Sequence, residues 1–454
     1  MIHRYKFDNL NIVLDVNSGA VHVAGDAAYR ALAFFETAEN TAAGAAAALA
    51  GLASDFPETE LREAILEIEV LTDEGTLFGA DEPIADERID ERGAVIKAMC
   101  LHVAHDCNMS CRYCFADDGS FAGRRSLLSA ETGRRAVDFL LARSGSRRNL
   151  EIDFFGGEPL LNFPVVRELV AYGRERETAY GKRIRFTITT NGLLLDAEKG
   201  AFCNAQMDNV ILSIDGRPAV NDAMRKTAGG GPTYDLILKN YRRFVEQREG
   251  KYYVRGTFTR CNPDFSEDVR HLADLGFRNI SAEPVVADPE YDFALREEDV
   301  PRILEEYDRL AALCLDRARS GADISFFHFN MDLEGGPCVF KRIAGCGAGT
   351  EYVAVSPEGD LYPCHRFVGK PAFRMGNIDD ENFENAFYAR FNRAHIQNKP
   401  ACKACWAKFY CGGGCHANAY QANGDILKPY AIGCALERKR VECAIGIRAA
   451  LLEA

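Results

Sequence analysis

The cysteines are the residues of this 454-residue chain whose type and spacing could do chemistry. There are 16, and they are unevenly distributed: three fall within residues 107–114, and seven more form a spaced set between residues 346 and 434. The first residues run into Asp8 and Asn9 and lack the apolar core of a secretion signal, so we expect a cytoplasmic chain with reduced thiols. Clustered thiols in such a chain indicate metal ligands rather than disulfides.

Cys107, Cys111 and Cys114 stand in the order C-x3-C-x2-C directly after a strand-like segment. Three thiolates on one short loop can hold three irons of a [4Fe–4S] cube and leave the fourth iron open. A zinc site with three cysteines is the alternative, and it needs a fourth ligand, which His102 or His105 could supply.

The C-x3-C-x2-C spacing resembles the signature of the radical S-adenosylmethionine superfamily. In that family the open iron chelates the amino and carboxylate groups of S-adenosylmethionine, and electron transfer into the sulfonium breaks a C–S bond. We expect Tyr113 and Phe115, which flank Cys114, to shield the cluster and the adenine from water.

A Gly-Gly-Glu-Pro turn follows the second predicted strand. Gly156 and Gly157 allow the backbone to approach a ligand closely, because glycine has no Cβ. Glu158 can accept hydrogen bonds from the methionine amino group, which is the role of this motif in the family that the cysteines resemble. A plain strand-to-helix turn would not explain an acid between two glycines and a proline.

Polar residues also end the third and fourth predicted strands. Thr190 and Asn191 follow the third strand, and Ser213 lies at the end of the fourth, where such groups suit a ribose and carboxylate site. Arg225 and Arg255 are candidate partners for the carboxylate of S-adenosylmethionine, because a guanidinium is a planar, bidentate donor. Each arginine is equally compatible with a place on the surface or at the sheet edge.

Alternating strand-like and helical segments must position these motifs. Six strands are predicted at 98–103, 151–155, 185–189, 209–214, 252–259 and 279–284, with helical segments between them at 130–143, 165–180, 233–247 and 268–275. This alternation predicts an α/β fold with a parallel sheet, here a partial (β/α)6 barrel. Functional residues should then lie at the C-terminal ends of the strands.

Seven cysteines near the C-terminus follow a second pattern with fixed spacings. They are Cys346, Cys364, Cys402, Cys405, Cys411, Cys415 and Cys434. Position by position, and including Gly359, the pattern resembles the SPASM domain of radical enzymes that modify peptides and proteins. The resemblance implies a nearer auxiliary cluster on Cys346, Cys364 and Cys415, and a farther one on Cys402, Cys405, Cys411 and Cys434. Three [4Fe–4S] clusters are therefore expected, with zinc as the alternative for the C-x2-C pair.

The nearer auxiliary cluster would need a fourth ligand. Either Cys338 supplies it, or the position is open and binds a cysteine thiolate of the substrate. Five other cysteines have no motif partners and are predicted to be buried free thiols; they are Cys100, Cys203, Cys261, Cys314 and Cys443.

Residues 1–85 are predicted to form a separate module. Strand-like segments at 5–16 and 20–23 precede helical patterns, and residues 42–53 suit either a poorly packed helix or a linker. Two strands followed by helices suit a winged-helix-like module. It resembles the peptide-recognition element of many enzymes that modify ribosomally made peptides, which captures a leader peptide as an extra strand; a merely structural cap is the alternative. The remaining domains are predicted at 97–300 (radical core), 301–335 (bridging helices) and 336–454 (SPASM).

Two segments narrow the resemblance further. Residues 101–108 and 355–365 look like those of the maturases of six-cysteine (SCIFF) peptides, which form intramolecular cysteine thioether crosslinks. The alternative is an anaerobic sulfatase-type maturase, which oxidises a Cys or Ser to formylglycine and carries an aspartate base after the cysteine that corresponds to Cys364. This chain has His365 there, a candidate catalytic base that can take up a proton near neutral pH. A hydrogen-bonding role and a plain surface position are the other interpretations of His365.

Charge and composition limit the partners. A net charge of −13 argues against binding to nucleic acid or to an acidic membrane surface, and no apolar run reaches the roughly 18 residues of a membrane span. The expected partners are a small cysteine-rich precursor peptide, bound through its leader, and reduced flavodoxin or ferredoxin as electron donor. The non-enzymatic alternative is an iron–sulfur electron-transfer protein, which would need no nucleoside site.

Overall fold

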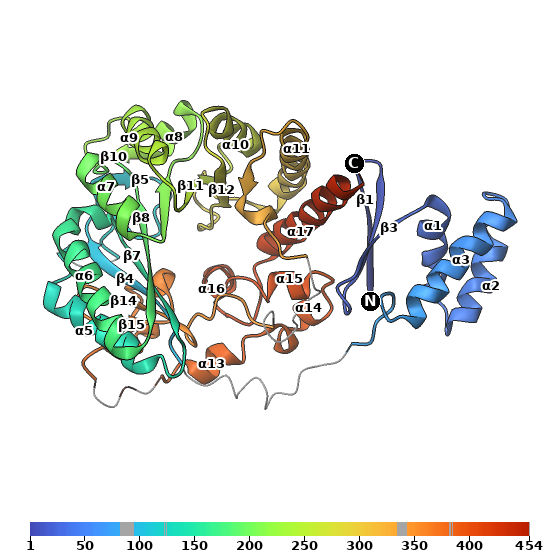
Figure 1. Ribbon diagram of the computed structural model, residues 1–454, viewed down its shortest axis with the longest axis horizontal. Helices are drawn as coiled ribbons and strands as arrows, with labels where there is room; N and C mark the ends of the chain where they lie inside the picture. The colour runs from blue at the N-terminus through green and yellow to red at the C-terminus, as the bar shows by residue number, and fades with distance from the viewer. Residues whose placement is uncertain are drawn as a thin grey trace.

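The computed structural model describes residues 1–81, 95–121, 123, 125–333, 343–380, 383 and 385–453. Three parts follow one another along the chain (Figure 1). An N-terminal sheet with helices is followed by a large central sheet with helices, and then by a C-terminal part with many short elements.

Six parallel strands form the middle of the central sheet, in the spatial order β4-β7-β8-β9-β11-β12. Their bounds are Ala98–His105, Asn149–Gly156, Arg183–Thr190, Asn209–Ser213, Lys251–Phe258 and Asn279–Pro284. All six lie where the sequence predicts a strand, so the parallel α/β prediction is confirmed. The described path of the sheet ends at β13 (Ser325–Phe326) on one side and at β16 (Gly376–Asn377) on the other, and does not close.

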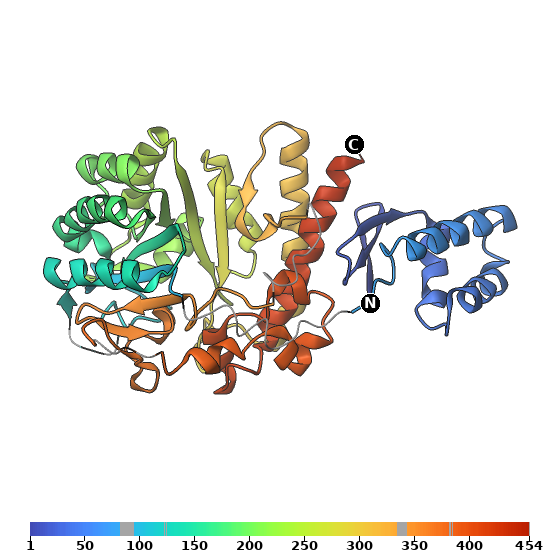
Figure 2. The same cartoon turned by 60° about the horizontal axis from the view of Figure 1, so that its bottom comes forward.

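Helices cover one face of the central sheet (Figure 2). They are α5 (Ala130–Arg143), α6 (Phe163–Tyr180), α7 (Ala197–Gln206), α8 (Pro218–Met224), α9 (Tyr234–Glu246), α10 (Phe265–Asp274) and α11 (Val300–Arg319). Strand side chains alternate between the two faces, so Leu150, Ile152 and Phe154 of β7 are buried in the main core. Phe155, on the other face, packs against the cluster that holds Cys364. The C-terminal part therefore covers the face that the helices leave free.

The C-terminal part extends the central sheet instead of forming a sheet of its own. β14 (Tyr352–Val355) pairs in parallel with β4, and β15 (Asp360–Tyr362) and β16 continue the sheet in antiparallel order. Short helices follow: α13 (Tyr388–Asn392), α14 (Pro400–Lys403), α15 (Lys408–Cys411) and α16 (His416–Asn423). Because β14 lies beside β4, the segment around Cys364 is held close to the loop that follows β4.

The last helix, α17 (Ala431–Leu452), corrects the sequence prediction, which found few helical signals after residue 336. Its buried side chains occur on all sides, so it has no single apolar stripe to reveal it. It packs against α11 and against β1 and β2 of the N-terminal sheet. Within it, the buried Arg440 donates from Nε to the Tyr307 hydroxyl of α11 at 2.8 Å.

The N-terminal part also differs from its prediction. It has three antiparallel strands, not two: β1 (Ile2–Phe7), β2 (Leu10–Asp15) and β3 (Val21–Ala24). The predicted strand 5–16 breaks because Asp8 adopts a left-handed φ of 52°, and Asp8 with Asn9 forms a tight turn. Three helices follow, α1 (Asp26–Phe35), α2 (Thr41–Leu52) and α3 (Glu58–Asp73), so residues 42–53 belong to a helix rather than a linker. The winged-helix assignment stays a prediction.

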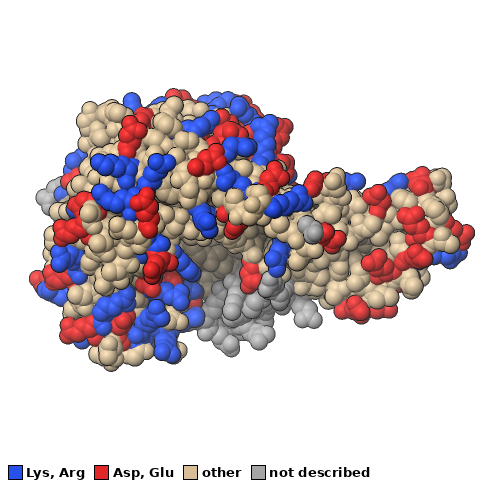
Figure 3. Space-filling view, turned by 45° about the horizontal axis from the view of Figure 1, so that its top comes forward, with Lys and Arg blue, Asp and Glu red and all other residues tan. Residues whose placement is uncertain are grey.

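The N-terminal sheet is docked on the C-terminal part (Figures 1 and 2). The His3 ring stacks on Trp406 with centroids 3.7 Å apart, and the Tyr5 hydroxyl donates to the Glu442 carbonyl at 2.9 Å. Ile12 and Leu14 share an apolar cluster with Val441 of α17. Acidic side chains are prominent on the outer end of this N-terminal module in the view of Figure 3, as the five glutamates of α3 lead one to expect.

Candidate active site

The loop after β4 carries the first three cysteines. Residues 109–111 form β5, which pairs antiparallel with β10 (Arg225–Thr227) and sets Arg225 opposite Cys111. Burial, together with the nearby Glu158 and the thiols of Cys111 and Cys114, raises the pKa of Cys107 to about 12. The Met109 amide donates to Cys107 Sγ at 3.4 Å. The loop thus brings the three thiols close together, and their role as cluster ligands stays a prediction. Cys338 lies outside the described residues.

Glycines allow this loop to pack tightly against the turn after β7. A Cβ on Gly156, whose φ is 131°, would lie 2.1 Å from the Ala104 carbonyl oxygen. A Cβ on Gly157 would lie 2.2 Å from the Asp106 carbonyl oxygen and 3.1 Å from Cys107 Cβ. Such distances exclude any side chain, so both glycines are needed for the close approach to the cysteine loop.

Glu158 joins the ends of β7 and β8. Its buried carboxylate accepts hydrogen bonds from the Thr190 hydroxyl (2.7 Å), the Asn191 amide (2.7 Å) and the Leu160 amide (3.0 Å). Burial raises the pKa of Glu158, and these hydrogen bonds act in the opposite direction. A carboxylate has about four acceptor sites, so one remains for an ammonium group.

Asn191 and Ser213 lie at the same edge of the sheet. The Asn191 side-chain amide donates to Asn108 Oδ1 at 2.8 Å, beside Cys107. The Tyr241 hydroxyl lies 3.1 Å from the carbonyl oxygens of both Thr190 and Ser213, and so ties β8 to β9. The motif residues that the sequence places at three strand ends are therefore neighbours, as parallel strands require.

Tyr113, Asp215 and Arg225 form a buried cluster beside these strand ends. The Tyr113 hydroxyl donates to Asp215 Oδ2 at 2.6 Å and accepts from Arg225 Nη1 at 3.0 Å. Arg225 Nε is buried and has no hydrogen-bond partner among the described residues. Asp215 was not among the predicted site residues. The sequence feature that could have indicated it is the Asp-Gly pair after β9, but this pair is also common in ordinary turns.

Arg255, the second candidate arginine, lies elsewhere. Its Nη2 is 3.7 Å from Glu283 Oε1, which is also 3.0 Å from His328 Nε2. The structure thus brings Arg225, and not Arg255, next to the cysteine loop.

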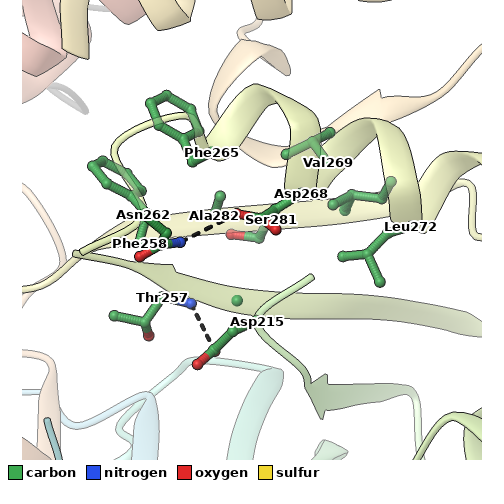
Figure 4. Close-up of a pocket in the computed structure, with 12 residues that line it drawn as sticks. Asp215, Thr257, Phe258, Asn262, Phe265, Asp268, Val269, Leu272, Ser281 and Ala282 are labelled. Atoms are coloured by element: carbon green, nitrogen blue, oxygen red, sulfur yellow. Dashed lines mark hydrogen bonds between the residues drawn. The ribbon is translucent and has the colours of Figure 1, made fainter. Parts of the chain in front are cut away.

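A small pocket opens beside Asp215, between β11, β12 and α10 (Figure 4). Its volume is only about 10 Å³, and its lining includes Thr257 and Asn262. The Thr257 amide donates to Asp215 Oδ1 at 3.0 Å, and Asn262 Nδ2 donates to Asp268 Oδ2 at 3.2 Å. The pocket places further polar groups near the carboxyl ends of β9 and β11, and none of its lining residues except Asp215 belongs to a sequence motif.

Phe115 and His365 connect this site to the C-terminal part. Phe115 is 45% exposed, and its ring lies 5.8 Å from that of His365 and under the Arg366 guanidinium at 5.0 Å. Its described ring contacts are thus with Phe121 and the C-terminal part, and its role as a shield for adenine stays a prediction. His365 also lies 5.1 Å from Phe155, so it is not a plain surface residue.

The environment of His365 keeps its ring neutral. Burial lowers the pKa of His365 to about 3, and the charges of Arg366 and Arg255 add to that effect. Its Nδ1 lies 3.2 Å from the Tyr352 hydroxyl. A neutral imidazole held in this way can accept a hydrogen bond, whereas a pKa of about 3 makes it a weak base near neutral pH.

His102 and His105 pair with each other. His102 Nδ1 and His105 Nε2 are 3.0 Å apart, and both rings pack on Phe121. Burial lowers the pKa of both. Neither ring is directed to a thiol by any hydrogen bond among the described residues, so the histidine ligand of the zinc alternative gains no support.

The C-terminal cysteines fall into two groups of neighbours. Burial raises the pKa of Cys364 to about 12, and Cys346 and Cys415 raise it further. Burial, with contributions from Cys434 and Cys405, raises the pKa of Cys402 to about 11. Burial, with contributions from Cys434 and Cys402, raises the pKa of Cys411 to about 12. The two groups of neighbouring thiols coincide with the two sets that the sequence analysis expects, and their role as ligands stays a prediction.

The arrangement of these side chains distinguishes a site for a single metal ion from a site for an iron–sulfur cluster. In the described part of the chain, no three His, Cys, Asp or Glu side chains converge on the position of a single ion. A [4Fe–4S] cube binds each thiolate through a different iron, so its ligands surround it rather than converge. The grouped thiols and the glycine-lined loop fit iron–sulfur clusters, and the unpartnered Arg225 Nε fits a bound carboxylate.

The unassigned cysteines are mostly as predicted. Cys100, Cys203, Cys314 and Cys443 are buried free thiols, whereas Cys261 is exposed, which corrects its prediction. Cys261 lies just after β11, on the loop that precedes α10, where its side chain meets solvent.

Comparison with known proteins identifies two family domains. Residues 101–255 match the Radical SAM superfamily, and residues 346–406 match SPASM, an iron–sulfur cluster-binding domain. The cysteine-type anaerobic sulfatase-maturating enzyme of Clostridium perfringens is 24% identical over 325 residues, 68% of this chain and 85% of that enzyme. Mycofactocin maturase MftC of Mycolicibacterium smegmatis is 27% identical over 332 residues, 70% of this chain and 78% of the relative.

Solved structures share the fold. Native anSMEcpe with bound AdoMet superposes with a TM-score of 0.64 at 19% identity, covering 78% of this chain and 99% of that one. Streptococcus suis SuiB bound to precursor peptide SuiA gives a TM-score of 0.53 at 15% identity, covering 95% of this chain and 98% of that one. The second match necessarily includes residues of the N-terminal module. In the part of the chain that the structure describes, no helix is long and apolar enough to cross a membrane.

Proposed function

Since residues 101–255 form a radical S-adenosylmethionine domain and residues 346–406 a SPASM domain, we propose that this chain is a peptide maturase that forms intramolecular cysteine thioether crosslinks in a small, cysteine-rich precursor. The observation that carries the proposal is the contact between the two cysteine regions. Phe115 follows Cys114, and its ring packs against His365, which follows Cys364. A peptide thiolate bound beside Cys364 would therefore lie close to the site where the radical arises.

The residues at the strand ends bind and orient S-adenosylmethionine in this proposal. Glu158 accepts from its ammonium group, Asn191 lies beside its ribose, and Arg225 pairs with its carboxylate through the free Nε. Tyr113 and Asp215 hold the Arg225 guanidinium in place. When bound, the clusters and S-adenosylmethionine supply a radical that removes a hydrogen atom from a peptide carbon, and accept the electron left over when the C–S bond closes.

The fourth position of the nearer auxiliary cluster is where this proposal places the substrate. Cys346 and Cys415 are neighbours of Cys364, and the buried Cys100 also lies near it. Cys338, the internal candidate for the fourth ligand, lies outside the described residues. We propose that a peptide thiolate takes the fourth position. His365 then acts at that thiol as a neutral acceptor, with its ring oriented by the Tyr352 hydroxyl.

The N-terminal module recognises the leader of the precursor in this proposal. β1 lies against α17, where the side chains of His3 and Tyr5 contact Glu442. β3 pairs only with β2 in the described chain, so its outer edge can accept an added strand. SuiB, whose fold matches 95% of this chain, is a protein solved with its precursor peptide SuiA, which supports a peptide partner here. Reduced flavodoxin or ferredoxin is the proposed electron donor.

A second candidate function is formylglycine formation in a sulfatase-type substrate. The observation in its favour is the similarity to the Clostridium perfringens enzyme over 85% of that enzyme's length. His365 in place of an aspartate, and the fused N-terminal module, favour thioether formation. The two reactions give different products, so one assay separates them.

The test is an anaerobic incubation of reconstituted protein with S-adenosylmethionine, a reductant and a precursor peptide encoded beside the gene, read by mass spectrometry. We expect a peptide lighter by a pair of hydrogens per crosslink, with fewer alkylatable thiols and no aldehyde. An aldehyde would establish the second candidate. A Cys107→Ala variant is the control, and must yield neither 5′-deoxyadenosine nor product. If 5′-deoxyadenosine forms and the peptide is unchanged, the substrate proposal is wrong; if neither forms in protein with its clusters, the enzyme proposal fails.

A further inference from the structure

Lys399 is a buried cation in the C-terminal part that no sequence motif singles out. It directly precedes α14, and its side chain is 0% exposed. Among the described residues, no Asp or Glu forms an ion pair with it. A buried ammonium without a negative partner is costly, because transfer of a charge from water to the protein interior loses its hydration.

The contacts of Lys399 lie between the two auxiliary cysteine sets. Its Nζ donates to the Gly413 carbonyl oxygen at 2.8 Å, and Gly413 stands between Cys411 of the farther set and Cys415 of the nearer set. Its own carbonyl oxygen accepts from the Cys402 amide at 2.8 Å. The lysine is thus attached to the backbone of both cysteine loops.

Cysteine sulfurs are the acidic groups that surround this ammonium. Burial lowers the pKa of Lys399, and the thiols of Cys402, Cys411, Cys434 and Cys415 oppose that effect. Neutral thiols carry no charge with which to compensate a lysine. Thiolates that bind iron–sulfur clusters do, because a cluster with cysteine ligands carries net negative charge. Negatively charged clusters on these cysteines would therefore compensate the buried charge of Lys399.

We propose that Lys399 is the shared counter-charge of the two auxiliary clusters and raises the reduction potential of both. A fixed positive charge favours the form of a cluster that carries one more electron, and net charge and hydrogen bonding are main determinants of cluster potentials. Lys399 is therefore a positioning residue for electron transfer. The inference rests on the proposed function, because it requires clusters on both cysteine sets.

The test is a redox titration of the full-length, reconstituted protein, followed by electron paramagnetic resonance, with iron counted for each variant. We expect Lys399→Met to make one-electron reduction of both auxiliary clusters at least about tenfold less favourable, which is a shift of about 59 mV to lower potential. Lys399→Arg should stay near the wild-type potentials, since it keeps the charge. The cluster on Cys107, Cys111 and Cys114 should be unchanged in every variant.

Lys403→Met is the matched control, because Lys403 ends the short helix α14 that Lys399 precedes but is exposed, and it should leave all potentials unchanged. A Lys399→Met protein with full iron and wild-type auxiliary potentials would overturn the inference. If Lys399→Met loses the auxiliary iron, Lys399→Arg decides: retention of iron supports the role of the charge, and loss contradicts it. Wild-type protein with iron for the first cluster alone would instead refute the cofactors of the proposed function.

Discussion

Arg225 is the residue for which the structure makes the sharpest prediction about S-adenosylmethionine. Its Nη1 is held by the Tyr113 hydroxyl, and its buried Nε has no partner among the described residues. Arg225→Lys keeps the charge but loses the planar second donor. A hydrogen bond between charged groups contributes about 1.5–3 kcal/mol, so we expect S-adenosylmethionine to bind about tenfold to 100-fold more weakly.

Equilibrium dialysis against labelled S-adenosylmethionine, with protein of equal iron content, measures this effect. Arg296→Lys serves as control, because Arg296 is an exposed arginine whose ion pair with Glu298 spans 3.9 Å at the surface. Unchanged affinity in Arg225→Lys would show that the carboxylate binds elsewhere, with Arg255 the next candidate.

Residues whose partners are close in sequence were predictable, and those with distant partners were not. Cys107, Cys111, Cys114 and the Gly156–Glu158 turn are defined by short spacings that can be read directly. Asp215 acquires its role from Tyr113, which is 102 positions away, and Lys399 from loops that only the folded chain brings together. Sequence spacing therefore yields the candidate ligands, whereas Asp215 and Lys399, which depend on distant partners, were not predicted.

At the scale of elements, the turn from β7 to η1 (Pro159–Asn162) is the part with the least freedom. Gly157→Ala would set a Cβ 2.2 Å from the Asp106 carbonyl oxygen, so the turn or the cysteine loop must move. We expect the variant to lose the cluster on that loop, about four iron atoms per chain, together with the formation of 5′-deoxyadenosine.

Iron analysis and visible absorption of the reconstituted variant measure this loss. Gly25→Ala is the control: its Cβ would meet nothing within 4 Å, and its φ of −63° suits alanine. Retention of full iron and of S-adenosylmethionine cleavage by Gly157→Ala would mean that the close approach has no part in holding the cluster.

The elements that sequence patterns predicted are those with a clear hydrophobic period. The six strands of the central sheet alternate with amphipathic helices, and all six were found. Helix α17 was not predicted, because the N-terminal sheet, α11 and the cysteine loops bury it from several sides. This burial removes the polar face that marks a surface helix. The break between β1 and β2 was not predicted, because the alternation of apolar and polar residues continues across the turn at Asp8.

At the scale of the whole molecule, the docked N-terminal module sets which surface remains for a peptide. One side of its sheet packs on α17, where Ile12 and Leu14 meet Val441, and its helices cover the other side. This arrangement depends on contacts between the two ends of the chain and could not be predicted from either end alone. In the proposed function, the outer edge of β3, which pairs only with β2 in the described chain, is where a leader peptide adds a strand.

Val23 tests this docking of the leader, because it lies on β3 and is 40% exposed, which is unusual for valine in a strand. An added strand would cover such a side chain with its own apolar groups. Val23→Asp places a charge there, and we expect at least about tenfold weaker binding of the precursor peptide, because burial of an unpaired carboxylate costs well above 1.4 kcal/mol. Formation of 5′-deoxyadenosine without peptide should be unchanged, since the S-adenosylmethionine site lies in another domain.

Fluorescence anisotropy with a labelled leader segment measures the affinity, and Leu127→Asp, which changes a similarly exposed residue on β6 (Ser126–Leu127), is the control. Equal affinity of Val23→Asp and the wild type would move the leader to another surface and leave the N-terminal module as a structural cap.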